Sequence, residues 1–83
     1  MPRIVVYTTD WCGYCERAKA LLDRHGLEYE EVHLDGRPDF RRRLLELTGS
    51  ETVPQIVVDG EPLGGYLELW KLARTGGLER LAA

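Results

Sequence analysis

The sequence predicts an α/β fold: a four-stranded mixed sheet with helices on both faces. Runs of β-branched residues alternate with segments of helical periodicity along the chain. Their order is strand, helix, strand, helix, strand, strand, helix, which combines a crossover connection with a hairpin. The chain has 83 residues, so a single domain over residues 1–83 is expected. A domain of this size buries only about 60% of the surface that its unfolded chain exposes, so its core must be simple.

The first half of the chain predicts a strand, a helix and a second strand. Residues 3–8 (RIVVYT) are β-branched and aromatic, as in a buried strand. A helix is expected from Gly13 to His25, because apolar residues recur there at helical spacing and Gly26 stands where helices commonly end. Residues 27–34 (LEYEEVHL) alternate imperfectly and are interpreted as a second strand, parallel to the first.

A second amphipathic helix is expected after the turn DGRPDF. Phe40, Leu44 and Leu47 are spaced i, i+4 and i+7, so they share one helix face. Residues 41–43 are three arginines that would face water, and Gly49 is a stop signal.

Residues 53–65 (VPQIVVDGEPLGG) predict a hairpin, because two short β-rich runs are joined at Asp59–Gly60, a dipeptide typical of tight turns. A final helix is expected from Gly65 to Arg74. Its apolar stripe would consist of four side chains: Tyr66, Leu69, Trp70 and Ala73. Residues 78–83 (LERLAA) predict one further helical turn.

Composition and charge exclude several classes of function. Hydrophobic residues make up 43% of the chain and charged residues 30%, as in ordinary soluble proteins. The net charge is −3 and no basic face is visible in the sequence, so no nucleic-acid partner is expected. The apolar run at residues 3–8 is too short for a signal peptide or a membrane span. We therefore expect a cytoplasmic protein with no membrane partner; we also expect a monomer.

Cys12 and Cys15 are the only cysteines, and they stand where the first strand gives way to a helix. A structural zinc site needs four ligands, whereas the chain offers this pair and two distant histidines, His25 and His33, so we expect no metal. A structural disulfide is also disfavoured, because it would close a very short loop and because the cytoplasm is reducing. We interpret His25 as a cation at a helix end and His33 as a polar residue on a strand edge.

A redox role explains the placement of the two cysteines. The first backbone N–H groups of a helix are unpaired, and the partial positive charge there stabilises a thiolate. Cysteines in such positions commonly have a pKa between about 3.5 and 7.5 instead of about 8.5. We predict that Cys12 is the nucleophile and that Cys15, one turn into the helix, attacks the mixed disulfide formed on Cys12. Gly13 permits a tight turn, and Tyr14 either walls the site or is simply exposed beside it.

Three segments in this order resemble the thioredoxin superfamily, and within it a glutaredoxin of the short bacterial class. They are YTTDWCGYCERAKALL (7–22), TVPQIVVDG (52–60) and LGGY (63–66). The resemblance covers nearly the whole chain and implies a thioredoxin-like fold and thiol–disulfide oxidoreductase activity. The string TTDWCGYC is also similar to mycoredoxins, which serve mycothiol, and WCG is shared with thioredoxins.

The resemblance also implies how a substrate would bind. Glutathione or another low-molecular-weight thiol would be a co-substrate, with no tightly bound cofactor. Pro54 would follow a cis peptide bond and place the Val53 backbone beside Cys12, where it pairs with the cysteine part of glutathione; the alternative for Pro54 is a rigid strand entry. Gly64–Gly65 would open the last helix, whose N-terminus would hold the γ-glutamyl carboxylate. The implied substrate-binding residues are Tyr14, Thr52, Val53, Pro54, Gly65, Tyr66 and Leu67.

Three departures from the glutaredoxin pattern affect this site. Gly13 replaces the usual proline. Thr9 and Asp10 occupy places where a lysine often helps to hold the glycine carboxylate of glutathione. Tyr66 replaces the small residue that usually follows the glycine pair. Leu67 stands where an aspartate usually meets the γ-glutamyl amine, and the acidic Glu68 comes one position later. Losing two charged contacts of about 1.5–3 kcal/mol each would weaken glutathione binding substantially.

The predicted function is a glutaredoxin-type thiol–disulfide oxidoreductase that acts on disulfide-containing proteins or mixed disulfides. Glutathione, another cellular thiol or a reductase would regenerate it. Two alternatives stay open. One is a redoxin linked to mycothiol or thioredoxin reductase. In that case Trp11 would be an exposed contact beside the nucleophile; the other interpretation of Trp11 is a partly buried packing residue. The other is a carrier of an iron–sulfur cluster, held between two subunits by Cys12 and an external thiol.

Overall fold

The computed structural model describes residues 2–37 and 39–82, without the side chain of Ala82. Its elements follow the predicted order and add a short terminal helix: β1 (Ile4–Thr8), α1 (Gly13–Arg24), β2 (Glu30–His33), α2 (Phe40–Thr48), β3 (Gln55–Val58), β4 (Glu61–Gly64), α3 (Tyr66–Arg74) and α4 (Gly77–Ala82). The helical turn expected at the C-terminus is confirmed as α4, with Ala83 outside the described residues. The turn expected before α2 includes Pro38, which also lies outside them.

The four strands form one mixed sheet in the order β2-β1-β3-β4. β1 and β2 are parallel, with Val5 opposite Glu30 and Thr8 opposite His33. The remaining pairs, β1 with β3 and β3 with β4, are antiparallel. The chain turns between β3 and β4 at Asp59–Gly60, both of which have positive φ. The predicted sheet and hairpin are therefore confirmed.

The second strand is shorter than the predicted residues 27–34. Residues 27–29 lie before the strand, since Gly26 has a φ of 69° and the N–H of Leu27 donates to the carbonyl of Leu22 at 3.0 Å, which closes the end of α1. Leu27 is nevertheless buried and joins the core. The imperfect alternation of apolar and polar residues in this segment therefore corresponds to a strand of only four residues.

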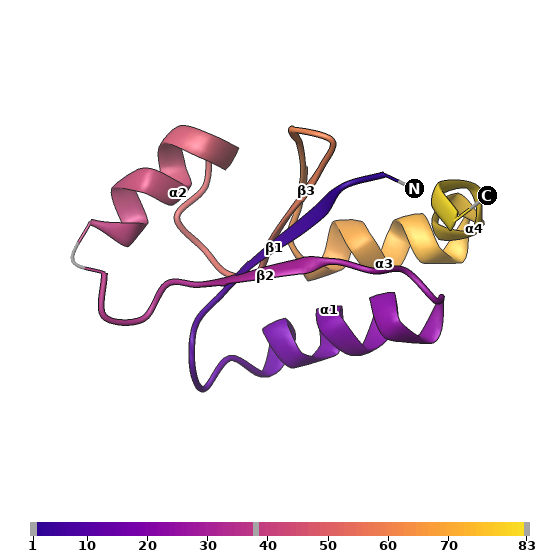
Figure 1. Ribbon diagram of the computed structural model, residues 1–83, viewed down its shortest axis with the longest axis horizontal. Coiled ribbons are helices and arrows are strands. Elements are labelled where there is room, and N and C mark those ends of the chain that lie inside the picture. Colours follow the sequence, from indigo (N-terminus) through magenta and orange to yellow (C-terminus); the bar gives the residue numbers. More distant parts are fainter. Residues whose placement is uncertain (1, 38, 83) are drawn as a thin grey trace.

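The main core lies on one face of the sheet, where α1 and α3 pack (Figure 1). Ile4 and Val6 alternate along β1 and point to this face, as the two-residue period of a strand requires. The core consists of eight buried residues: Ile4, Val6, Ala18, Leu22, Leu27, Ile56, Leu69 and Leu78. Figure 1 shows α2 on the opposite side of the sheet, so the expectation of helices on both faces is confirmed.

The cover provided by α2 is thinner than the sequence predicts. Leu44 is buried at 1% exposure, whereas Leu47, expected on the same apolar face, is 48% exposed. Leu47 lines the rim of a cavity of about 320 Å³ between α2 and the sheet, together with Tyr7 and Phe40. Leu44 is the one fully buried residue of this nine-residue helix. The three arginines at 41–43 face water, as predicted.

The strand directions bring three distant segments together at one end of the sheet. The loop between β1 and α1 leaves β1 at Thr8. Because β3 is antiparallel to β1, its first residue, Gln55, lies opposite Tyr7 near that same end. β4 returns there at Gly64 and leads directly into α3. None of the described helices combines the length and apolar character needed to cross a bilayer.

Candidate active site

Cys12 is the N-cap residue of α1. Its backbone is extended, with φ −110° and ψ 102°, and the backbone N–H of Cys15 donates a hydrogen bond to its Sγ atom at 3.1 Å. A helix N-cap normally uses a side-chain oxygen to satisfy such an unpaired N–H group. Here a sulfur atom takes that place, which confirms that Cys12 stands at the helix start.

The two cysteines differ sharply in exposure. Cys15 is 1% exposed and faces the interior from the first turn of α1, whereas Cys12 is half-buried. Their sulfur atoms lie at disulfide-bonding distance and their Cα atoms are 5.2 Å apart, within the usual range for a disulfide. The pair can therefore close a disulfide while only Cys12 is open to a second molecule.

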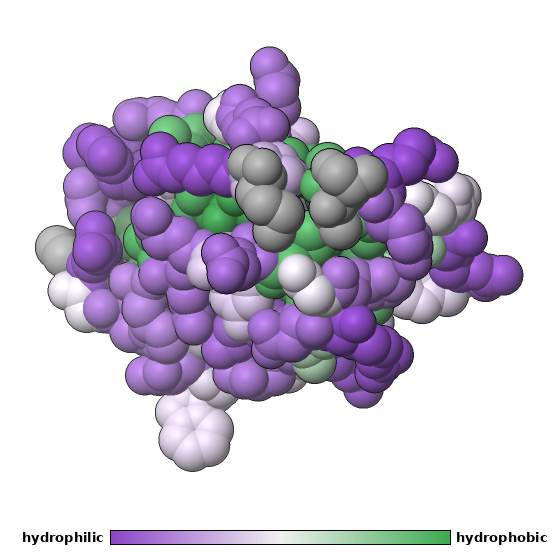
Figure 2. Space-filling view, turned by 45° about the vertical axis from the view of Figure 1, so that its right-hand side comes forward, coloured by the Kyte–Doolittle hydropathy of each residue, from purple (hydrophilic) through white to green (hydrophobic). Residues whose placement is uncertain are grey.

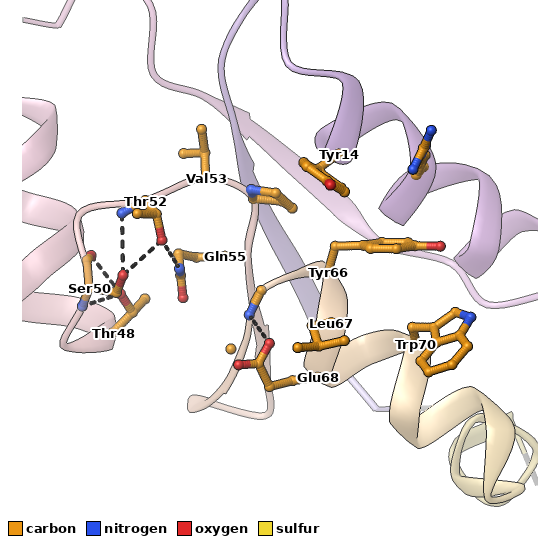
Figure 3. Close-up of a pocket in the computed structure, with 14 residues that line it drawn as sticks. Tyr14, Thr48, Ser50, Thr52, Val53, Gln55, Tyr66, Leu67, Glu68 and Trp70 are labelled. Carbon is orange, nitrogen blue, oxygen red and sulfur yellow. Dashed lines mark hydrogen bonds between the residues drawn. The ribbon is translucent and has the colours of Figure 1, made fainter.

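The segment before β3 faces Cys12 across the site. The peptide bond between Val53 and Pro54 is cis, and the carbonyl oxygen of Val53 lies 3.9 Å from Cys12 Sγ. Both features that the resemblance implied for this segment are confirmed. Polar side chains hold the approach to it: the hydroxyl groups of Ser50 and Thr52 are 2.9 Å apart, and the Gln55 amide donates to the Thr52 hydroxyl at 3.1 Å (Figure 3).

The third wall is the N-terminus of α3. Gly65 is its N-cap, so the expectation that the glycine pair opens this helix is confirmed. The backbone N–H of Gly65 donates to Glu68 Oε2 at 3.2 Å. The stem of Glu68 lies against Gly64, whose φ is 123°. The acidic side chain that follows Leu67 is thus turned back onto its own helix.

A cavity of about 720 Å³ lies between these three walls. All seven residues that the sequence analysis assigned to substrate binding line it, from Tyr14 on α1 through Thr52–Pro54 to Gly65–Leu67 (Figure 3). Five further lining residues were not predicted from the sequence: Arg17, Thr48, Ser50, Gln55 and Trp70. Gly64 and Glu68, which the sequence placed beside the site without assigning them to substrate binding, line it as well. Trp70 had a detectable signal, because it follows Tyr66 by four positions and so shares its helix face.

Aromatic side chains form the part of the cavity between α1 and α3. The ring centroids of Tyr14 and Tyr66 are 5.7 Å apart and the ring planes are inclined by 36°. The guanidinium carbon of Arg17 lies 5.4 Å from the Tyr14 centroid. Tyr14 is 59% exposed, so it both walls the site and faces solvent. Trp11 is fully exposed, which decides against the alternative of a partly buried packing residue.

A polar cluster braces the loop that precedes Cys12. His33 Nε2, at the end of the edge strand β2, lies 2.7 Å from Asp10 Oδ1 and 2.9 Å from Asp35 Oδ2. The hydrogen bond to Asp10, followed by attraction to both carboxylates, raises the pKa of His33 above its usual 6.5. One possible metal-ligand atom from each of Asp10, His33 and Asp35 lies within 4.8 Å of the others. All three side chains are exposed and pair with each other, so we interpret them as an ion-pair cluster and not as a metal site.

The family model for glutaredoxin matches residues 4–63, which is most of the chain. The chain belongs to the glutaredoxin family. It is 47% identical over 81 residues to a glutaredoxin of Pseudomonas aeruginosa, covering 98% of this chain and 96% of the relative. It is 40% identical over 81 residues to glutaredoxin 3 of Escherichia coli strain K12, covering 98% of both chains.

Solved glutaredoxin structures share the fold. The crystal structure of a buckwheat glutaredoxin–glutathione complex superposes with a TM-score of 0.86 at 34% identity, covering 96% of this chain and 76% of that one. The solution structure of a glutaredoxin from Brucella melitensis gives a TM-score of 0.84 at 38% identity, covering 98% and 88%. The thioredoxin-like fold is therefore confirmed, and the chain is a glutaredoxin-type thiol–disulfide oxidoreductase with a redox-active cysteine pair.

Proposed function

We propose that this glutaredoxin reduces protein disulfides and mixed disulfides of glutathione, with Cys12 as the attacking thiolate and Cys15 as the resolving thiol. The observation that carries the proposal is the hydrogen bond of 3.1 Å from the Cys15 backbone to Cys12 Sγ, at the N-terminus of α1. Donated N–H groups and the positive end of a helix favour the anionic form of a thiol, which is the nucleophile.

The exchange takes place in two steps that conserve electrons and protons. The Cys12 thiolate attacks one sulfur of the substrate disulfide, forming a mixed disulfide and releasing the other sulfur as a thiolate that takes up a proton. Cys15 then loses its proton and attacks Cys12 Sγ, which releases the reduced substrate. Two molecules of thiol, or a reductase, reduce the resulting Cys12–Cys15 disulfide. The Cα separation of 5.2 Å suits that closure.

The cavity beside Cys12 suits a small thiol in an extended conformation. The backbone of Val53, close to Cys12 Sγ, supports pairing with the cysteine part of the ligand. We propose that Tyr14 and Tyr66 cover this part of the ligand while Thr52, Pro54, Gly65 and Leu67 line the rest. Leu67 offers no charge for the γ-glutamyl amine. We therefore expect glutathione to be held mainly by its backbone and its sulfur.

A protein could also serve as the reductant. Trp11 precedes the nucleophile and is fully exposed, and exposed aromatic residues are common contacts at protein interfaces. This supports thioredoxin reductase as a second source of electrons beside glutathione. We place the protein in the cytoplasm, where glutathione keeps thiols reduced, and we propose that it acts as a monomer.

Single serine variants test the division of labour. Cys12→Ser is expected to abolish turnover of both protein disulfides and mixed disulfides, because the attacking sulfur is gone. Cys15→Ser is expected to keep most activity toward a glutathione mixed disulfide, which a second glutathione can resolve, and to lose reduction of protein disulfides. Equal loss in the two variants would refute the assignment, as would normal activity in Cys12→Ser.

The source of electrons is decided by running one mixed-disulfide assay with two reducing systems. Glutathione, glutathione reductase and NADPH form the first; thioredoxin reductase and NADPH form the second. We expect turnover with the first system. Turnover with thioredoxin reductase alone would overturn glutathione dependence and support the redoxin alternative. Reconstitution with iron and sulfide tests the cluster-carrier alternative. We expect a colourless monomer, which would rule this alternative out, whereas a brown dimer would support it.

A further inference from the structure

Two rows of side chains lead away from the active site along α1 and α3. On α1, Tyr14 is followed three positions later by Arg17. On α3, Tyr66, Trp70 and Arg74 succeed one another at intervals of four. Residues three or four apart lie on one face of a helix, so each row is continuous. The rows begin at Tyr14 and Tyr66, whose ring centroids are 5.7 Å apart, and both end in an arginine.

Each of these arginines lies over an aromatic ring of its own row, within cation–π distance. The Arg17 guanidinium carbon lies 5.4 Å from the Tyr14 centroid, and that of Arg74 lies 4.9 Å from the Trp70 centroid. A guanidinium placed over a ring can still meet a carboxylate in two parallel hydrogen bonds through its N–H groups. Within the described part of the chain, no carboxylate pairs with either arginine.

The surface between the two arginines is apolar and accessible. Figure 3 shows Tyr14 and Tyr66 facing one another between α1 and α3, with Trp70 farther along α3. Tyr14 is 59% exposed and Trp70 is 38% exposed, which is unusual for such large rings. Most of the face drawn in Figure 2 is hydrophilic, with hydrophobic atoms visible mainly in its centre, so exposed apolar surface is not a general feature there.

We propose that this aromatic–arginine surface, formed by Tyr14, Arg17, Tyr66, Trp70 and Arg74, docks the acidic flank of the cysteine in a protein disulfide substrate. The inference rests on the proposed function and names the class of protein that the same site prefers. Charge complementarity selects an acidic occupant, because two unpaired arginines are grouped here on a chain whose net charge is −3. The surface is also continuous with the cavity beside Cys12.

The length of the α3 row sets the position of the acidic residue. Arg74 is eight residues beyond Tyr66, a helical distance of about 12 Å at 1.5 Å per residue. An extended substrate chain covers this distance in about four residues. An aspartate or glutamate about four positions from the reacting cysteine would therefore reach Arg74, while the residues between them cover Tyr66 and Trp70.

The test uses symmetrical peptide disulfides and single turnover of the fully reduced protein, so no external reductant takes part. Each peptide has one cysteine, with either glutamate or lysine four positions away on both sides; a third peptide carries glutamate two positions away. Second-order rate constants for release of the free peptide thiol are compared. We expect the glutamate peptide to react at least fivefold faster than the lysine peptide, and also faster than the peptide with the shorter spacing. This preference should shrink in high salt.

Two charge reversals on α3 provide matched variants. Arg74→Glu is expected to abolish or invert the preference for the glutamate peptide. Lys71→Glu removes the same charge from an exposed neighbour outside the aromatic row and is expected to retain a preference above twofold. Equal effects of the two reversals, or equal rates for the wild type with all peptides, would overturn the docking surface. Failure to reduce any peptide disulfide would instead contradict the proposed function.

Discussion

The carboxylate of Glu68 closes the N-terminus of α3 by accepting a hydrogen bond from the backbone N–H of Gly65 at 3.2 Å. The same helix end borders the cavity beside Cys12. Exposed N–H groups at a helix N-terminus are favourable sites for an anionic ligand. In this chain a side chain of the protein already occupies one of them and adds a negative charge beside the others.

Glu68→Gln is expected to improve the binding of glutathione substrates. Glutamine can still accept the Gly65 hydrogen bond, but the variant loses the charge that repels a ligand carboxylate. We expect KM for a glutathione mixed disulfide to fall several-fold while kcat and Tm change little. Glu61→Gln, at an exposed site on β4, is the matched control and should leave KM unchanged. A rise in KM would show that Glu68 instead turns toward the γ-glutamyl amine.

Gly13→Pro is expected to stabilise the fold. Position 13 is the first residue of α1, where proline is favoured because its missing N–H has no helical partner. The extended backbone of Cys12, with φ −110° and ψ 102°, suits a residue that precedes proline. A stiffer unfolded chain should add about 0.4–1 kcal/mol to the free energy of unfolding, measured in urea. An unchanged or lower value would mean that the Gly13 N–H makes a contact that the native state needs.

Local rules explain how the element ends around this site could be predicted from the sequence, whereas its substrate-binding residues were implied by the resemblance to glutaredoxins. Cys12 was placed at a helix start because a strand pattern stops there and a helical period begins. Asp59–Gly60 and Gly65 were assigned from turn and helix-end chemistry, which depends on the backbone of a few neighbouring residues. In each case the decisive interactions are made within about five positions of the residue concerned.

Features that depend on packing between distant elements could not be predicted. Leu47 has the spacing of a core residue, yet its exposure depends on how closely α2 approaches the sheet. The contact between the Tyr14 and Tyr66 rings requires α1 and α3 to pack side by side. The cluster of Asp10 and His33 arises only because β2 pairs in parallel with β1 and brings residues 23 positions apart together.

Gly64→Ala is expected to destabilise the protein and to disturb the N-terminus of α3. The φ of Gly64 is 123°, a region that other L-residues adopt at a cost of about 1–3 kcal/mol. A Cβ atom there would also lie 2.8 Å from Cγ of Glu68 and push that side chain off Gly65. Urea denaturation should show the loss. Gly13→Ala is the control, because a Cβ atom at position 13 meets open space and alanine favours the helix.

The cluster around His33 should make stability depend on pH near neutrality. Asp10 and Asp35 face the Nε2 atom, and Glu31 lies 3.6 Å from Nδ1. Because the hydrogen bond to Asp10 and the nearby Asp35 raise the pKa of His33 above 6.5 in the folded protein, its stabilising contribution is fully present below pH 6.5 and is lost as the pH rises through the folded-state pKa.

Urea denaturation of the wild type and of His33→Gln between pH 5.5 and 8.5 measures this contribution. We expect the difference in the free energy of unfolding to be largest at the acidic end and to shrink as the pH rises, since glutamine cannot carry the charge. His25→Gln is the control, because it alters the other histidine, whose Nδ1 lies 3.0 Å from Glu79. This variant should keep the pH dependence of stability that is due to His33. A difference that is constant over the range, or that grows with pH, would show that protonated His33 does not brace the loop before Cys12.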